Sequence, residues 1–148
     1  MTKRYEHTQV GYLIIIVMTV ALIAVGVALV NEGMNWIAIL VMAIIAVALV
    51  QYSSLTVVIR EDLLEVRFGP GLIRKRYNLY DIESCYVVKN PWYYGWGIRL
   101  TPHGWLYNVS GFYAVEITLR TGKKFRIGTD TPQELEETIL QTINTSPK

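Results

Sequence analysis

The sequence predicts an α+β protein, in which a hairpin of two transmembrane helices precedes a β-rich domain that ends in a helix. Three observations support this prediction. Two long uncharged apolar runs lie within the first 52 residues, the apolar period changes to two after residue 53, and a helix-start signal stands at residues 130–134. Uncharged runs of about 17–25 residues are typical of membrane spans, and a period of two is typical of half-buried strands.

Composition divides the chain into the same two parts. The 148 residues are 52% hydrophobic and 18% charged, and the net charge is +2. Only four of the 26 charged side chains (14 basic plus 12 acidic) lie in residues 1–50. We therefore expect a membrane hairpin over residues 1–53 and a domain over residues 54–148. The low charged fraction excludes a disordered tail and a charge-driven nucleic-acid interface, and the small net charge agrees with the second exclusion.

The two apolar runs have the length of membrane spans. Residues 11–30 contain twelve Leu, Ile or Val side chains and no charge. Twenty residues at a rise of about 1.5 Å extend about 30 Å, the thickness of the hydrocarbon core. The second span is expected over residues 35–52, and Asn31 and Gly33 in the connector favour a tight turn. We therefore expect two spans.

Aromatic residues stand at the expected membrane edges, where such side chains are enriched: Tyr12, Trp36 and Tyr52. A cleaved signal peptide and a buried soluble helix pair are the alternative interpretations. The first would need a small-residue cleavage site after Val30, and the second would need a polar stripe along each helix; neither pattern is convincing in this sequence.

The basic residues predict the orientation of the hairpin. Lys3 and Arg4 precede the first span and Arg60 follows the second, whereas the connector has no Lys or Arg. Because cytoplasmic flanks carry the excess of Lys and Arg, both ends of the chain are expected in the cytoplasm. The single Cys85 agrees with this location, since a domain with one cysteine has no internal disulfide framework.

After residue 53 we expect about seven short antiparallel strands, arranged as a barrel or sandwich. The clearest pair is residues 115–119 and 125–127, which are joined through Thr121-Gly122. The C-terminal helix is expected to begin at Pro132, because Asp130–Glu134 combines a capping residue, proline at the first helical position and an acidic third residue.

Glycine and apolar positions of the domain resemble those of the bacterial pleckstrin-homology-like (PH-like) membrane proteins, a group of largely unassigned role. The resemblance implies two strongly bent sheets with a C-terminal helix at one open end and a location in the bacterial inner membrane. It does not imply a catalytic mechanism. PH domains that bind phosphoinositides have a basic first strand–strand loop, whereas the equivalent residues 60–63 here are acidic on balance. The matching residues are Gly95-Trp96-Gly97-Ile98-Arg99, Gly104, Tyr107, Gly111, Val115-Glu116-Ile117, Gly122-Lys123, Ile127-Gly128-Thr129-Asp130, Pro132 and Leu135.

Two clusters are candidate contact sites. A basic run could face an anionic leaflet, or it could protect a strand edge from aggregation. An aromatic loop could form a membrane or protein interface, or it could pack locally. The basic run is Arg74, Lys75 and Arg76, and the aromatic cluster is Trp92, Tyr93, Tyr94 and Trp96.

The sequence does not predict an enzyme. His7, His103 and Cys85 form no metal-ligand spacing and no recognisable triad, so no metal and no cofactor are expected. An enzyme that uses His103 is a remote alternative. We expect a membrane-anchored binding or scaffold module with a protein partner or a second copy of itself. The alternative is a module that senses anionic lipid headgroups through the basic run and the aromatic loop.

Overall fold

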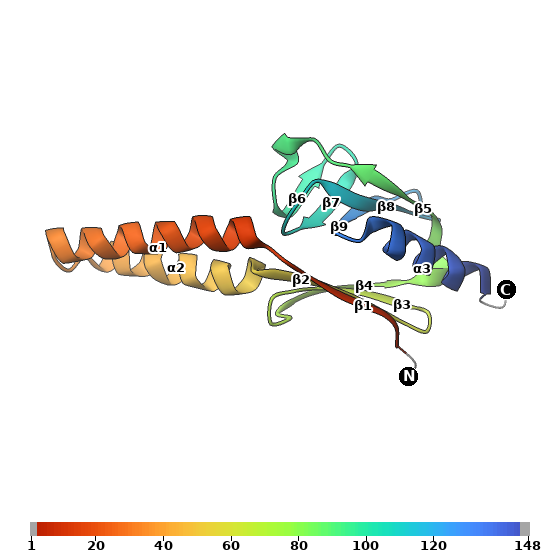
Figure 1. Cartoon of the computed structure of the whole chain (residues 1–148), viewed down its shortest axis with the longest axis horizontal. Coiled ribbons are helices and arrows are strands. Elements are labelled where there is room, and N and C mark those ends of the chain that lie inside the picture. Colours follow the sequence, from red (N-terminus) through yellow and green to blue (C-terminus); the bar gives the residue numbers. More distant parts are fainter. Residues whose placement is uncertain (1–2, 146–148) are drawn as a thin grey trace.

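A two-helix hairpin projects from one end of a pair of packed β-sheets in the computed structural model, which describes residues 3–145 (Figure 1). The hairpin consists of α1 (Tyr12–Glu32) and α2 (Trp36–Tyr52), and the third helix, α3 (Pro132–Thr145), ends the described chain. The helices therefore begin within one residue of the expected positions.

Both hairpin helices are apolar and pack against each other rather than into the domain. α1 is long and apolar enough to cross a membrane, by its length and composition. α2 has no charged residue, whereas α1 has only Glu32 at its end, and α2 is the shorter helix with 17 residues. No residue of α1 is buried, and the only buried residue of α2 is Gln51 at its end.

The first sheet contains a strand that the sequence did not predict. Its order is β1-β2-β3-β4 and all of its pairs are antiparallel. β1 precedes the hairpin and pairs with β2, which follows it. The sheet therefore takes residues from both sides of the hairpin, whereas we expected the domain to begin at residue 54. The strands are β1 (Lys3–Val10), β2 (Ser54–Arg60), β3 (Leu63–Phe68) and β4 (Ile73–Asn78).

The second sheet corrects the expected strand count and direction. Its order is β5-β8-β9-β7-β6. After residue 53 the described chain therefore forms eight strands rather than about seven, and β1 makes nine within residues 3–145. β9 lies between β8 and β7, and the β6–β7 hairpin pairs with the edge of β9 that faces away from β8. β7 and β9 are parallel in this arrangement. The two sheets do not close into a barrel. The strands are β5 (Ile82–Lys89), β6 (Gly97–Thr101), β7 (Gly104–Asn108), β8 (Tyr113–Leu119) and β9 (Lys124–Gly128).

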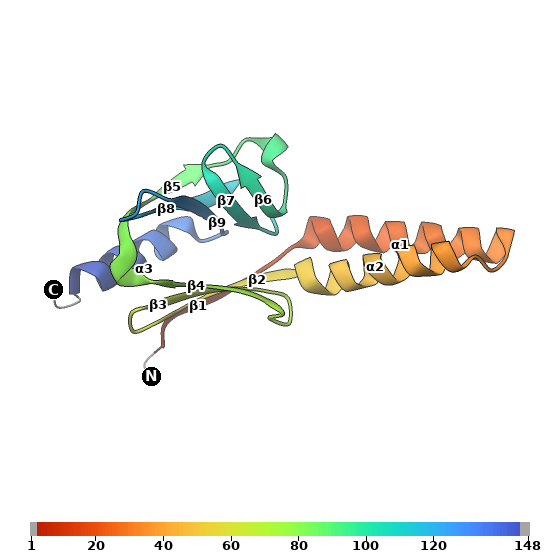
Figure 2. The ribbon, with the colours of Figure 1, turned by 180° about the vertical axis from the view of Figure 1, so that it is seen from behind.

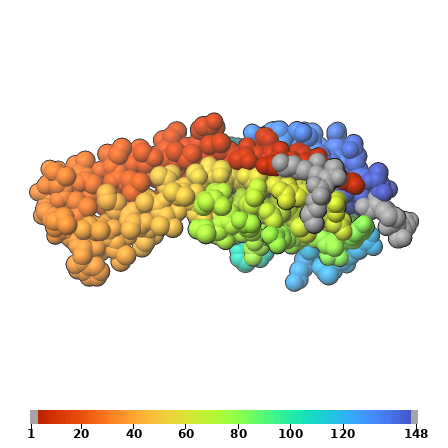
Figure 3. Space-filling model, turned by 90° about the horizontal axis from the view of Figure 1, so that it is seen from below, coloured from red at the N-terminus to blue at the C-terminus, as the bar shows by residue number. Residues whose placement is uncertain are grey.

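The hydrophobic core lies between the two sheets and includes α3. Leu135 and Ile139 of α3 are fully buried with Phe68 from the first sheet and Ile117 from the second. α3 contacts strands of both sheets, so it covers one side of the space between them (Figure 2). Figure 3 shows the molecule from below, where the outer face of the first sheet continues into the hairpin.

Tyr5 joins β1 to the core and provides a test of this unexpected strand. Its side chain is buried, and its hydroxyl lies 3.0 Å from the Thr131 hydroxyl at the start of α3. We expect Tyr5→Ala to lower the free energy of unfolding by about 3 kcal/mol and Tyr5→Phe by about 1 kcal/mol. Denaturant unfolding in mild detergent measures both changes. Arg4→Ala, exposed on the same strand, is the control and should change stability by less than about 0.5 kcal/mol. A Tyr5→Ala variant as stable as the native chain would contradict the role of β1.

Candidate functional site

The base of the hairpin is fixed to the first sheet by short-range contacts. The Gly11 amide donates to the Ser53 carbonyl at 2.8 Å, so the chain entering α1 is bonded to the chain leaving α2. Gln51 Nε2 donates to the Phe68 carbonyl at 3.1 Å. Gly69, with φ 52°, lies so close to α2 that an added Cβ would stand 2.4 Å from the Val50 carbonyl oxygen. The hairpin and the sheet are therefore joined without a flexible linker.

A groove of about 810 Å³ separates the hairpin base from the second sheet. One wall is apolar and consists of side chains from the first two turns of α1 together with Ala48 and Tyr52 of α2. The other wall is the segment Gly95–Leu100, which enters and forms most of β6. Arg99 is the one charged residue among the lining residues. The groove is thus an apolar surface with a single cation at its wall.

Local backbone geometry holds Arg99 at this wall. Its Nε donates to the Trp96 carbonyl at 3.2 Å, which ties the guanidinium to the turn before β6. Gly95 and Gly97 both have positive φ, 69° and 99°, a region that favours glycine. Within residues 3–145, Arg99 forms no ion pair with a carboxylate. Its positive charge is therefore not neutralised by the part of the chain described.

The aromatic cluster is divided by the structure into two exposed and two packed side chains. Trp92 and Tyr93 are 78% and 65% exposed in a short 3-10 turn at residues 92–94. Tyr94 packs edge-on against Tyr93 and also contacts the His103 ring. Trp96 precedes β6 rather than lying within it, and it is half-buried in the groove.

The three expected membrane-edge aromatics lie at the ends of the hairpin helices. Tyr12 begins α1 and Trp36 begins α2, and both are exposed. Tyr52 ends α2 and is half-buried, because its ring packs edge-on against Phe68 with a centroid distance of 5.7 Å. Tyr12 and Tyr52 therefore mark the base of the hairpin, and Trp36 marks its tip.

The basic run lies on β4, an edge strand of the first sheet, and Arg76 is the one member of the run that forms an ion pair within the described chain. Arg76 pairs with Glu65 at 2.8 Å, and Arg74 Nε donates to the Gly71 carbonyl at 2.6 Å. Lys75 is exposed. The structure does not bring these residues into the groove, so the basic run and the aromatic loop do not form one site.

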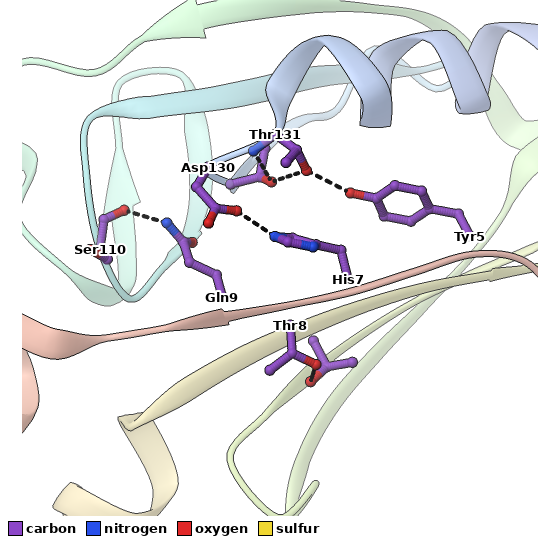
Figure 4. Close-up of polar contacts among 9 residues, drawn as sticks. Tyr5, His7, Thr8, Gln9, Ser110, Asp130 and Thr131 are labelled. Atoms are coloured by element: carbon purple, nitrogen blue, oxygen red, sulfur yellow. Dashed lines mark hydrogen bonds and ion pairs between the residues drawn. The ribbon is translucent and has the colours of Figure 1, made fainter.

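Alternate side chains of β1 connect the two sheets (Figure 4). Gln9 Nε2 donates to the Ser110 carbonyl at 3.1 Å, and His7 Nε2 bonds the Asp130 carboxylate. A His–Asp pair is one element of acid–base sites, but this pair lies at the surface and joins β1 to the residue before α3. We interpret it as a structural contact between β1 and the segment that leads into α3.

A buried polar network on the second sheet was missed by sequence reasoning. Glu116 and Arg126 are only 2% and 6% exposed, and their side chains are 2.8 Å apart on neighbouring strands. Arg126 also donates to Asn90 Oδ1 at 2.9 Å, and the Tyr86 hydroxyl donates to Glu116 at 2.5 Å. The network thereby fixes Asn90, the first residue of the connection that leads to the groove wall.

The network also sets the ionisation of Glu116. Burial acts to raise the pKa of this carboxyl, but hydrogen bonds from Tyr86 and Arg126, with the charges of Arg126 and Lys124, outweigh that effect. The pKa of Glu116 therefore lies below its ordinary value of 4.5. Because the folded-state pKa is lowered, the carboxylate stabilises the fold above pH 4.5, and this contribution is lost as the pH falls through the folded-state pKa.

No group of three or more His, Cys, Asp or Glu side chains within residues 3–145 is arranged to hold a metal ion. His103 lies in the exposed turn between β6 and β7. Comparison with protein-family models, curated proteins and solved structures gives no match for the chain. The resemblance to the PH-like membrane proteins therefore stays a prediction.

Removal of the Glu116 charge tests the network. Glu116→Gln should lower the free energy of unfolding at pH 7 by about 3 kcal/mol, because Arg126 is then left buried without its anion. The variant should also lose less stability than the native chain between pH 5 and about pH 3, since the titrating group is gone. Unfolding curves at several pH values measure both effects. Glu83→Gln, exposed on β5, is the control, and equal acid sensitivity of the native chain and Glu116→Gln would contradict this assignment.

Proposed function

We propose that this protein is a membrane-anchored binding module. In this proposal, the α1–α2 hairpin crosses a bilayer twice and the two-sheet domain lies against the cytoplasmic surface. The observation that carries it is the pairing of β1 with β2 across the hairpin. Two paired strands must lie on the same side of a membrane, so the segment between them crosses an even number of times.

The surface of the helices supports insertion. A helix in the core of a soluble protein buries at least one face, whereas α1 buries none of its residues. Its 21 residues extend about 32 Å, and the 17 residues of α2 extend about 26 Å, at the lower end of the spanning range. Exposure of this much contiguous apolar surface to water would be unfavourable.

The position of α1 in the fold argues against a cleaved signal peptide. Cleavage after α1 would remove β1, which contributes Tyr5 to the core and pairs along the whole length of β2. The domain would then lose an edge strand of its first sheet. Retention of the hairpin as an anchor avoids this loss.

The distribution of charge supports a cytoplasmic domain. Arg4, Arg60 and Arg67 lie on the domain side of the hairpin, whereas Glu32 is the only charged residue at the tip. Under the positive-inside rule, the domain faces the cytoplasm and the tip faces the opposite side. For a bacterial chain, this arrangement corresponds to the inner membrane.

The partner of the module is proposed from the surface at the hairpin base. A protein partner or a second copy was the first expectation from sequence, and an anionic lipid was the alternative, with the basic run and the aromatic cluster as candidate contacts. Of the aromatic cluster, Trp92 and Tyr93 are the exposed members. We propose an anionic lipid at a different place from the one expected, because the groove is apolar along the hairpin and its other wall carries Arg99, which forms no ion pair within the described chain. The PH-like character of the domain is part of the same proposal.

Charged residues placed in the middle of the helices test insertion. Val20→Arg and Ile44→Arg each replace an exposed side chain, and each should disfavour insertion by about 3 kcal/mol. The native chain should stay with membranes after alkaline carbonate extraction, and the double variant should move largely to the soluble fraction. Tyr80→Arg, on the surface of the domain, should behave like the native chain. Release of the native chain by carbonate would contradict the anchor.

Cysteine labelling tests the orientation. Cys85 is buried, and burial, with the nearby Glu136 charge, raises the pKa of its thiol to about 11, so it should not react near neutral pH. In intact bacterial cells, an impermeant maleimide should label Asn31→Cys at the hairpin tip and should label Gln133→Cys only after permeabilisation. The native chain, which retains only Cys85, is the background control. The reverse pattern would place the domain outside the cytoplasm.

A further inference from the structure

We propose that the groove between the hairpin base and β6 binds one anionic phospholipid, with an acyl chain along α1 and α2 and the phosphate at Arg99. This inference rests on the proposed membrane anchoring and names the ligand of the module. The groove, about 810 Å³, falls within the range of about 300–1,000 Å³ that small-molecule sites occupy.

The apolar wall is suited to a hydrocarbon chain. Leu13, Val17 and Met18 line it from α1, and Ala48 lines it from α2. These residues belong to the segments proposed to lie in the bilayer, so the groove opens directly toward the lipid acyl chains. The small side chain of Ala48 leaves space between the two helices and the second sheet.

The opposite wall is suited to a phosphate. Arg99 has five N–H donors, and Nε uses one of them on the Trp96 carbonyl. Within the described chain no carboxylate neutralises it and no hydrogen bond engages its terminal nitrogens. Arginine binds phosphate oxygens through charge-assisted and often bidentate hydrogen bonds. The guanidinium therefore provides a specific partner for a headgroup phosphate at the level of the hairpin base.

A lipid fits this groove better than a peptide does. A peptide lying along the hairpin would place backbone N–H and C=O groups at the edge of the hydrocarbon, where unpaired polar groups are costly. An acyl chain has no such groups. The basic run on β4 does not contribute, because it lies on the other sheet and Arg76 is paired with Glu65.

The test uses the full chain in nanodiscs of equal parts phosphatidylcholine and phosphatidylglycerol, followed by native mass spectrometry of the lipids that stay bound. We expect mostly one retained phosphatidylglycerol per chain. Arg99→Gln should reduce the retained phosphatidylglycerol about fivefold, the effect of one cation near an anionic surface. Arg120→Gln, which removes an exposed arginine on the β8–β9 turn, should leave it unchanged.

A second pair of variants tests the position of the lipid site by placing a large side chain inside or outside the groove. Ala48→Trp fills the groove and should reduce lipid retention, whereas Ala24→Trp, on an exposed position of α1 outside the groove, should not. Equal retention of both lipids, an Arg120→Gln effect as large as that of Arg99→Gln, or a dimer that carries no lipid would each overturn the proposal. If the chain remains carbonate-resistant in those cases, only the lipid site fails and the anchor stands.

Discussion

The antiparallel pairing of β1 with β2 is the interaction on which the rest of the structure depends. Each strand continues into one helix of the hairpin, with only Gly11 on one side and Ser53 on the other. These two residues are themselves hydrogen bonded. Gly11 has no room for a side chain, because an added Cβ would lie 2.8 Å from the carbonyl oxygen of Val109, the residue after β7 of the second sheet. The hairpin, the first sheet and the second sheet therefore meet at one crowded point.

The buried network on the second sheet and the groove are connected through a single segment. β5 and β6 lie at opposite edges of that sheet, so residues 90–96 must connect one edge to the other. Arg126 and Glu116 hold Asn90 at the start of this connection, and the Trp96 indole donates to the Gly111 carbonyl near its end. A buried ion pair that does not line the groove thus contributes to the position of the groove wall.

Local patterns in the sequence predicted the local parts of the structure. The apolar runs predicted the hairpin, Thr121-Gly122 predicted the β8–β9 hairpin, and the signal before Pro132 predicted the start of α3. β1 was not predictable in this way, because its inward positions include His7 and Gln9, which form polar contacts rather than an apolar stripe.

The parts that sequence missed depend on contacts between distant residues. The parallel pair of β7 and β9, the ion pair of Glu116 with Arg126, and the groove each require a register or a packing arrangement that no short window contains. Charged residues that alternate with apolar ones in a strand usually face solvent. Here the connection that begins at Asn90 contributes to the burial of Glu116 and Arg126. The alternating pattern alone therefore does not distinguish a buried charged side chain from one that faces solvent.

The place of the hairpin between two paired strands has a consequence for the order in which the chain assembles. β1 leaves the ribosome first, but its partner begins at Ser54, after 43 intervening residues (residues 11–53). If those residues remained a flexible loop, closing it would cost entropy before the strands could pair. A hairpin already inserted in the bilayer holds Gly11 beside Ser53 and removes most of that cost. Under the proposed anchoring, the membrane therefore brings β1 and β2 together, and insertion of the helices comes before the two strands pair.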